Sequence, residues 1–469
     1  MEKALFRLEH DSIGEKEVPA EAYYGVHSMR ARENFNITGH TVHPELIRGA
    51  AYIKKAAAIT NRDAGVLSAE RANAIVRACD EILAGKLHDQ FITDPIQGGA
   101  GTSMNMNANE VIANRAIELL GGKKGDYSVV NPNDHVNFGQ STNDVYPTCG
   151  KLAIITLLGK TQAQLVRLHS ALLAKAEEFD TVIKMGRTQL EDAVPIRLGQ
   201  EFHAYAAAIA RDIKRFDKAH DEVRCINMGG TAIGTGLNCD VYYYNNIARV
   251  LSEVFGQELV QCEDTVDGTQ NLDCYVCVSG TLKSCAVNLS KMCNDLRLMS
   301  SGPRTGLGEI NLPARQNGSS IMPGKINPVI PEVVSQVAFS VIGNDMTVAM
   351  AAEAGQLELN AFEPVIFYKL LESLDAITGA VDTLVEHCVT GITANVKHCR
   401  DLVEHSIGIV TATNPYIGYE TAANTAKEAL RTGKSVRTLL IEHDLLPGRN
   451  LDEILDPFKM TRPGIPGKD

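Results

Sequence analysis

Residues 202–223 read FHAYAAAIARDIKRFDKAHDEV, and this stretch decides the fold class. Its large apolar side chains recur at steps of three, four and seven residues, at Phe202, Tyr205, Ile209, Ile213, Phe216 and Val223. That spacing puts them on one face of an α-helix. Two further helical patterns cover 275–299 and 152–179, and neither contains a proline. The sequence therefore predicts three helices of about 25 residues each.

Helices of this length predict an all-α bundle. At 1.5 Å per residue each helix would be nearly 40 Å long, and such helices pack side by side. The first half of 152–179 is apolar on more than one face, so helices of this chain or of further copies must cover it. Breaks rich in Gly and Pro predict three domains: a helical N-terminal domain over 1–140, the long-helix bundle over 141–395 and a small helical C-terminal domain over 396–469.

The charge balance limits the partners of the chain. Its 469 residues include 45 Lys and Arg against 57 Asp and Glu, a formal net charge of −12. This balance argues against nucleic-acid binding and against a polybasic surface for anionic membranes. No uninterrupted run of 18 apolar residues offers a membrane span. We therefore expect a cytoplasmic protein without nucleic-acid or membrane partners.

The cysteines and histidines predict neither disulfides nor a metal centre. Eleven cysteines are an odd number without framework spacing, which favours reduced thiols. Cys274 and Cys277 have CxxC spacing, but they fall in a helical pattern without a second pair and are interpreted as structural residues. No histidine spacing is typical of a metal site. No cofactor is expected to be required, and activation by a divalent metal stays open.

Four segments interrupt the helical patterns and are rich in hydroxyl, amide and glycine residues: 97–107, 140–144, 186–192 and 318–328. Each alone is also consistent with a helix-capping loop. The fourth, however, frames Ser319, Ser320 and Lys325 with two glycines and two prolines, a composition typical of functional loops. Ser141 and Asp144 have the spacing of a capping box. Hydroxyls, helix-start N–H groups and one lysine together predict a site for a small anion.

Residues 318–328, GSSIMPGKINP, match the GSSxMPxKxNP signature of the fumarase/aspartase superfamily. The other three segments resemble further signature regions of that superfamily in the same order, and the likeness extends from 17–26 to 414–420. The resemblance implies a three-domain all-α fold and a homotetramer whose long helices form a twenty-helix core. It also implies active sites that are each built from three subunits.

Within the superfamily the chain resembles the aspartases. Residues 97–110 read QGGAGTSMNMNANE and residues 140–144 read QSTND, whereas fumarases more often have GSGTQSNMN and SSND. Gln189 stands where fumarases have a histidine. The resemblance implies a carbon–nitrogen lyase that reversibly eliminates ammonia from L-aspartate to give fumarate. Fumarate hydratase, and a structural relative that has lost catalysis, are the alternatives.

The resemblance also implies a role for individual residues. Ser319 is expected to be the general base that removes a proton from C3 of the substrate. The substrate's β-carboxylate is expected to be bound by Thr102, Ser141, Thr142 and Ser320. The α-carboxylate is expected to be bound by Thr188, Lys325 and Asn327. Asn143 is expected to contact the amino group, and Gln189 lies on the side of the leaving group.

Overall fold

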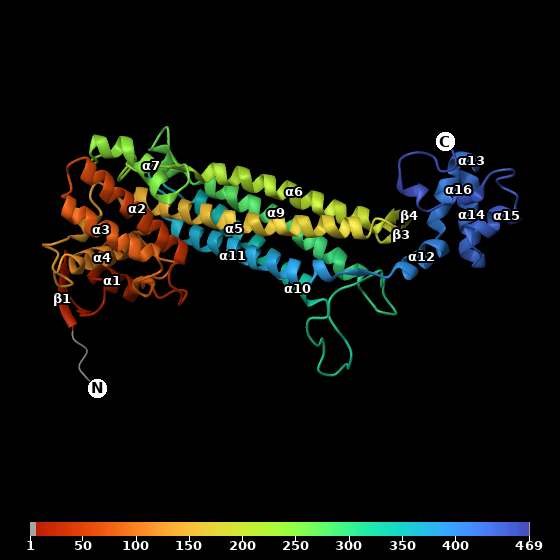
Figure 1. Ribbon diagram of the computed structural model, residues 1–469, viewed down its shortest axis with the longest axis horizontal. Helices are drawn as coiled ribbons and strands as arrows, with labels where there is room; N and C mark the ends of the chain where they lie inside the picture. The colour runs from red at the N-terminus through yellow and green to blue at the C-terminus, as the bar shows by residue number, and fades with distance from the viewer. Residues whose placement is uncertain (1–5, 469) are drawn as a thin grey trace. The chain divides into compact units, whose positions relative to one another are not determined.

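The computed structural model describes residues 6–468, and the first five residues and Asp469 lie outside the described part. The chain is 61% helical, and the strands of the described part form two-stranded sheets only, so the predicted all-α class is confirmed (Figure 1). The chain divides into two compact units. Unit 1 comprises 6–162, 214–284 and 339–376, and unit 2 comprises 163–213, 285–338 and 377–468. The division into three domains stays a prediction.

Five long helices dominate the described chain. They are α5 (Thr142–Glu178), α6 (Leu198–Val223), α9 (Asp273–Met299), α10 (Val329–Glu353) and α11 (Glu363–His387). The helices predicted over 152–179, 202–223 and 275–299 are therefore confirmed in α5, α6 and α9, although α5 ends at Glu178, one residue earlier than predicted. The sequence boundaries of the two units fall inside these five helices.

Shorter elements complete each unit. Unit 1 contains β1 (Phe6–Asp11), β2 (Gly14–Pro19), α1 (Val26–Asn34), α2 (Pro44–Asp63), α3 (Ala69–Leu83), α4 (Thr102–Leu119), β5 (Cys225–Ile226), α7 (Val241–Phe255), β6 (Val260–Gln261) and α8 (Asp267–Gln270). Unit 2 contains β3 (Ile183–Thr188), β4 (Glu191–Arg197), β7 (Ile310–Asn311), β8 (Thr393–Ala394), α12 (Val396–His405), α13 (Asn414–Ile417), α14 (Tyr419–Thr432), α15 (Val436–Glu442) and α16 (Leu451–Ile454). Strands β5 and β6 are parallel, and the other three pairs are antiparallel.

The N-terminal half of α5 is buried on all sides, as its apolar sequence predicts. Four consecutive residues, 152–155, are each at most 1% exposed. One neighbour is α11, which approaches closely because Gly150 has no side chain: a Cβ there would lie 2.1 Å from the Phe367 ring. Phe367 also contacts Tyr146 of α5 and Tyr275 of α9, with ring centroids 5.2 and 5.1 Å apart. This aromatic cluster fixes the start of α5, where the second polar segment lies.

Helix α10 exposes an apolar face. Phe339, Met346 and Met350 follow one another at steps of seven and four residues and are 63–65% exposed. Among residues 6–468, α10 is the one helix that is long and apolar enough to cross a membrane by length and composition alone, and 28% of its most apolar window is buried. It also carries Asp345, whose carboxylate binds the Lys283 ammonium at 2.6 Å. A helix with an exposed apolar face and an ion-paired charge on another side fits a protein interface better than a lipid contact.

Candidate active site

A glycine turn places Thr102 at the start of α4. Gly101 has a φ of +88°, and a Cβ there would lie 2.3 Å from the Tyr146 ring, so only glycine fits. Thr102 is exposed, and its Oγ1 donates a hydrogen bond to the carbonyl of Gly99 at 2.7 Å. The turn therefore presents a hydroxyl at a helix N-terminus, where an anion is favoured.

The second polar segment forms the predicted capping box at the start of α5. The Ser141 N–H donates to Asp144 Oδ1 at 2.9 Å, and the Asn143 N–H donates to Ser141 Oγ at 3.2 Å. Thr142 and Asn143 therefore lie in the first turn of the helix, as the spacing predicts. Asn105 of α4 donates from Nδ2 to Thr142 Oγ1 at 3.1 Å. This bond brings the first and second polar segments together.

The second carboxylate oxygen of Asp144 holds the loop that follows β5. It accepts hydrogen bonds from the Gly229 and Thr231 N–H groups, both at 3.1 Å. Burial raises the pKa of Asp144 to about 6, against the effect of these hydrogen bonds. The same loop accepts a hydrogen bond from Asn143 Nδ2 at the Ala232 carbonyl, at 2.7 Å. We call the predicted anion site at Thr102, Ser141, Thr142 and Asn143 the cradle. The loop over 227–232 supports it, a contribution that the polar segments did not predict.

A buried lysine lies behind this cradle. Lys54 of α2 is fully buried, and its ammonium donates to Asn137 Oδ1 at 2.7 Å and to Gln140 Oε1 at 2.9 Å. Asn137 Oδ1 also accepts from Asn105 Nδ2 at 3.2 Å, so the network continues to the residue that binds Thr142. Burial lowers the pKa of Lys54 to about 7, although Asp144 and two cysteines oppose the shift. Lys54 therefore titrates near neutral pH in the support of the cradle.

This burial makes stability depend on pH. Between about pH 7 and its unfolded value of 10.5, Lys54 is protonated in the unfolded chain but largely neutral in the folded one. Stability therefore rises with pH in this window. We expect the unfolding free energy of the wild type, relative to Lys54→Met, to increase by about 2 kcal/mol between pH 7 and pH 9. Urea unfolding followed by far-ultraviolet circular dichroism measures it. Lys55→Met is the control, because it removes a half-buried lysine that pairs with Asp80. If the unfolding free energy of the wild type rose with pH by the same amount relative to Lys55→Met as relative to Lys54→Met, the assignment to Lys54 would be contradicted.

In unit 2 the third polar segment is a hairpin. Thr188 is the last residue of β3, and Gln189 and Leu190 form the turn to β4 with φ values of +55° and +68°, as a two-residue hairpin turn requires. Thr188 and Gln189 are exposed at this tip. Arg187 points elsewhere, because its Nη1 donates to Oε1 of the fully buried Glu309 at 2.7 Å. The hairpin therefore offers a hydroxyl and an uncharged amide, but no free guanidinium.

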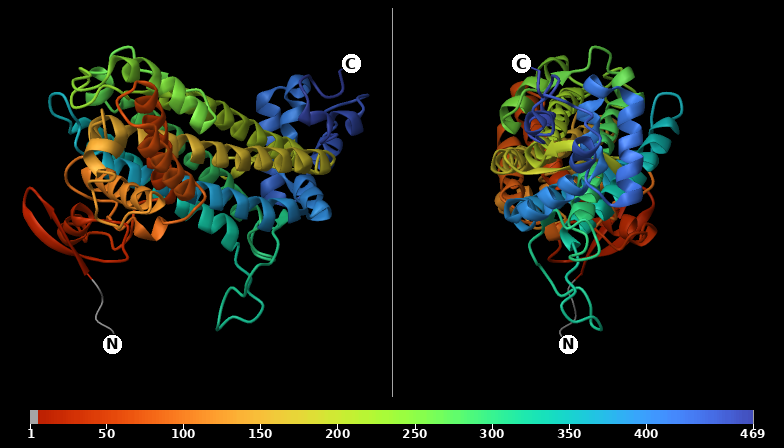
Figure 2. Two further views of the ribbon diagram at one scale, coloured as in Figure 1. Left: turned by 60° about the vertical axis from the view of Figure 1, so that its left-hand side comes forward. Right: turned by 90° about the vertical axis from the view of Figure 1, so that its right-hand side faces the viewer.

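The fourth polar segment is a loop that closes on itself. The Gly318 N–H donates to the Lys325 carbonyl at 2.8 Å, and Asn327 Nδ2 donates to the Gly318 carbonyl at 3.0 Å. A Cβ on Gly318 would lie 2.6 Å from the Lys325 oxygen, so the closure requires glycine. Figure 2 shows the long connection from α9 to α10, which contains this loop, as extended chain without helix.

The closed loop surrounds the Ser319 hydroxyl with backbone donors. Ser319 Oγ accepts hydrogen bonds from the Met322 N–H at 3.0 Å and the Ile321 N–H at 3.2 Å. Donors aimed at an oxygen favour its charged form, so they stabilise a serine alkoxide. Lys325 is exposed, and within residues 6–468 its ammonium has no ion-pair partner. The loop therefore presents one hydroxyl that accepts two backbone hydrogen bonds and one exposed positive charge.

The structure divides the predicted site residues into two groups. Unit 1 holds Thr102, Ser141, Thr142 and Asn143, and unit 2 holds Thr188, Gln189, Ser319, Ser320, Lys325 and Asn327. Asn105 joins two segments of the first group. In the second group, no hydrogen bond of the described chain joins the hairpin to the loop over 318–328.

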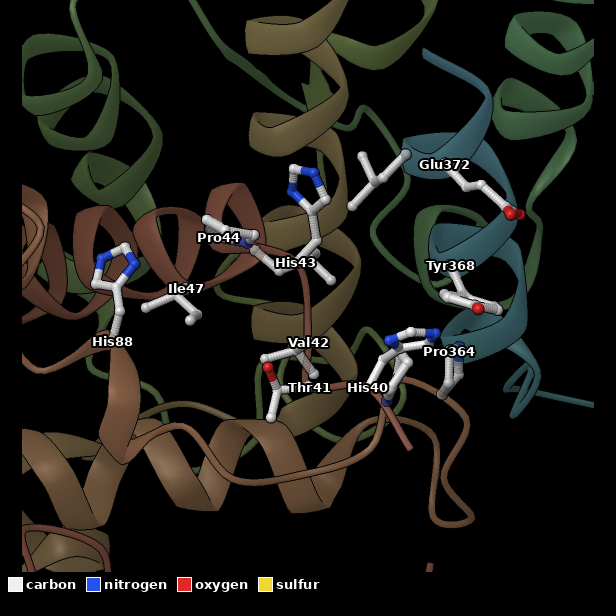
Figure 3. Close-up of a pocket in the computed structure, with 13 residues that line it drawn as sticks. His40, Thr41, Val42, His43, Pro44, Ile47, His88, Pro364, Tyr368 and Glu372 are labelled. Carbon is white, nitrogen blue, oxygen red and sulfur yellow. The ribbon is translucent and has the colours of Figure 1, made fainter. Parts of the chain in front are cut away.

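A separate cavity of about 380 Å³ in unit 1 contains none of the predicted residues. Figure 3 shows His43 at the start of α2 and Tyr368 and Glu372 on α11 among the residues that line it. His43 Nε2 lies 2.8 Å from the Asp375 carboxylate. Across the described residues, no group of three or more His, Cys, Asp or Glu side chains is arranged to hold a metal ion.

Comparisons with known proteins identify relatives of the whole chain. Residues 14–343 match the family model described as Lyase, and residues 409–462 match Fumarase C C-terminus. The chain is 54% identical to the aspartate ammonia-lyase of Bacillus subtilis (strain 168) over 464 aligned residues. The alignment covers 99% of this chain and 98% of that protein. The solved fumarate lyase:delta crystallin from Brucella melitensis bound to cobalt is 50% identical, with a TM-score of 0.94 over 98% of this chain and 100% of that chain. The class II fumarase from Schistosoma mansoni is 35% identical, with a TM-score of 0.95 over the same shares. The chain therefore belongs to the fumarase/aspartase superfamily of lyases.

Proposed function

We propose that this protein is a carbon–nitrogen lyase that reversibly converts L-aspartate to fumarate and ammonia. The observation that carries the proposal is the 54% identity, over nearly the full length of both chains, to the Bacillus subtilis aspartate ammonia-lyase. The fold alone does not choose this activity, because the Schistosoma mansoni fumarase has a TM-score as high as that of the Brucella protein. The choice rests on sequence identity and on the chemistry of the site.

Ser319 is the proposed general base. Its alkoxide, stabilised by the Ile321 and Met322 N–H groups, takes a proton from C3 of aspartate. The electron pair left at C3 spreads into the β-carboxylate as an enediolate, which needs preorganised donors. Those donors are proposed to be Thr102, Ser141, Thr142 and Ser320. The C2–N bond then breaks, the double bond of fumarate forms, and ammonia leaves with the bonding electron pair.

The remaining residues are proposed to orient the substrate. Thr188, Lys325 and Asn327 bind the α-carboxylate, and the free lysine supplies the charge. Asn143 fits the amino group, since an ammonium needs an acceptor and Asn143 already uses its Nδ2 to bind the Ala232 carbonyl. Its Oδ1 is left to accept from the substrate.

Gln189 favours an amine as the leaving group. Loss of water from malate requires a proton donor for a poor leaving group, a role that suits histidine. The amine of aspartate is already protonated near neutral pH and leaves as ammonia without an added acid. An uncharged amide at the exposed tip of the hairpin is compatible with the second reaction and suits the first less well.

We therefore expect the purified protein to convert L-aspartate far faster than it dehydrates L-malate. The measurement follows the absorbance of fumarate with each substrate at the same enzyme concentration. A malate rate equal to or above the aspartate rate would assign the chain to the fumarases. No turnover of either substrate would favour the structural relative without catalysis, although Ser319, Lys325 and Asn327 are all retained.

We also propose a homotetramer with shared active sites. The five long helices of one chain become twenty in four copies, the number that the superfamily resemblance implies. The exposed apolar face of α10 supports burial against other copies. Because the resemblance implies sites built from three subunits, we propose that the cradle, the hairpin that carries Thr188 and the loop that carries Ser319 come, in each site, from three different chains.

Mixing variants tests the sharing. Ser319→Ala and Thr188→Ala should each be nearly inactive alone, but after subunit exchange at equal amounts about a quarter of the sites should draw both intact residues from different chains. The activity of the mixture should therefore return to about a quarter of the wild-type activity. The control mixes Ser319→Ala with the Ser319→Ala, Thr188→Ala double variant, which can form no intact site. Lack of recovery despite demonstrated exchange would contradict shared sites.

No cofactor is proposed to be required, because the protonated leaving group and the loop and cradle donors account for the charges that develop. Divalent-metal activation remains open to test by chelation, since the Brucella melitensis relative was solved bound to cobalt. We propose a cytoplasmic location for the protein.

A further inference from the structure

Two cysteines that are 37 residues apart in the sequence contact each other in unit 1. Cys225 lies in β5 and Cys262 directly follows β6, and their Sγ atoms are 3.1 Å apart. The parallel strands hold both backbones: Cys225 pairs with Val260, and the Cys262 N–H donates to the Ile226 carbonyl at 2.8 Å. Neither cysteine belongs to the CxxC pair that the sequence singles out. All eleven cysteines of the chain are free thiols.

The surroundings activate one of the two thiols. The hydrogen bond from Cys262 and the ammonium of Lys151 lower the pKa of Cys225 to about 6, against burial and the charge of Asp267. The same contact and burial raise the pKa of Cys262. Both side chains are partly exposed. A thiolate within reach of solvent is the form of cysteine that reacts with peroxides, and a second thiol beside it can resolve the product.

A disulfide between the two requires little movement. An S–S bond is about 2.05 Å long, so the sulfurs would approach by about 1 Å. Gly268 of α8 makes room for Cys262, because a Cβ there would lie 2.6 Å from its Sγ. Because the Cys262 sulfur lies against the backbone at Gly268, we expect Cys225 and the residues that follow it to make most of the movement.

Those residues hold the anion cradle. Asn227, two positions after Cys225, donates from Nδ2 to the Asn143 carbonyl and to Thr269 Oγ1, both at 3.0 Å. The same loop continues to the N–H groups that bind Asp144. A displacement of Cys225 therefore reaches the first turn of α5 through Ile226 and the hydrogen bond from Asn227 to the Asn143 carbonyl.

We propose that Cys225 and Cys262 form an oxidation-sensitive pair, which hydroperoxides convert to a disulfide that weakens the cradle at Asn143. The Cys225 thiolate attacks one oxygen of hydrogen peroxide, the O–O bond breaks, and hydroxide leaves while a sulfenic acid forms. The Cys262 sulfur then attacks the Cys225 sulfur, the S–O bond breaks, and water leaves with the Cys262 proton. The two sulfurs are oxidised and the peroxide is reduced. Only the effect on turnover rests on the proposed function.

The test treats the purified full-length protein with hydrogen peroxide and maps its peptides without reduction. We expect a linked peptide containing Cys225 and Cys262 and the loss of two titratable thiols. We expect kcat/KM for L-aspartate to fall by about tenfold, because a 1 Å shift of a positioning group is costly, and to recover with dithiothreitol. If the protein turned over no aspartate, the proposed function would fail, and the linked peptide would still decide the oxidation site.

Three single variants separate the roles. Cys225→Ser should keep its activity in peroxide. Cys262→Ser should accumulate a sulfenic acid at Cys225 that dimedone labels, because the resolving thiol is missing. Cys277→Ser, which removes an exposed thiol of α9, should behave as the wild type. Absence of the linked peptide, or equal peroxide inhibition of Cys225→Ser, would overturn the proposal. A linked peptide with unchanged turnover would overturn the coupling to Asn143.

Discussion

Replacing Ser319 by alanine is expected to lower kcat for L-aspartate by at least ~10³-fold, as for loss of a base used in the chemical step. Ser319 Oγ accepts two backbone hydrogen bonds from residues of its own loop, and these donors would stabilise the proposed alkoxide. Alanine removes the oxygen but leaves Gly318 and Asn327, which close the loop, in place. The substrate should therefore still bind, and KM should change much less than kcat.

Ser320→Ala is the matched control, because it removes a neighbouring exposed hydroxyl from the same loop. Ser320 is proposed to be one of four donors to the enediolate and not to move a proton, so its loss should lower kcat by less than the loss of Ser319. Steady-state rates across the pH range, with circular dichroism to compare folding, make the measurement. Equal effects of the two substitutions would mean that Ser319 acts through the shape of the loop, and another base would have to be sought.

The helices of this protein were predictable because their signals are local. The apolar spacing in 202–223 and 275–299 is set by the helical period alone, and the structure forms α6 and α9 over these stretches. The capping box at Ser141 and Asp144 depends on residues three positions apart, and both of its hydrogen bonds form. Features that depend on one turn of chain were therefore read correctly from the sequence.

The support of the cradle was not predictable, since its partners are far apart in the sequence. Lys54 lies in an alanine-rich helical stretch without a polar motif, but the fold buries it against Asn137 and Gln140. The second oxygen of Asp144 binds N–H groups more than 80 residues away. Cys225 and Cys262 likewise meet only through the pairing of β5 and β6. Such contacts require the tertiary structure.

Lys325→Ala is expected to raise KM for L-aspartate by roughly ten- to a hundredfold, since charge-assisted contacts contribute about 1.5–3 kcal/mol. The lysine is exposed and has no ion-pair partner in the described chain, so its charge is available to a substrate carboxylate. The other cation in the polar segments, Arg187, is already engaged in an ion pair with the fully buried Glu309, which also pairs with Lys184. L-aspartate and fumarate should be affected alike, because both carry the carboxylate in question.

Two further variants define what the lysine contributes. Lys325→Arg should restore binding only in part, because the planar guanidinium cannot occupy the position of a compact ammonium beside Asn327. Lys434→Ala removes a surface charge of unit 2 that pairs with Glu442, and it should leave KM unchanged, which separates a local contact from the effect of net charge. KM values for both substrates at constant ionic strength make the comparison. An unchanged KM in Lys325→Ala would show that the α-carboxylate is held without this lysine, and its binding would then fall to Thr188 and Asn327 as uncharged donors.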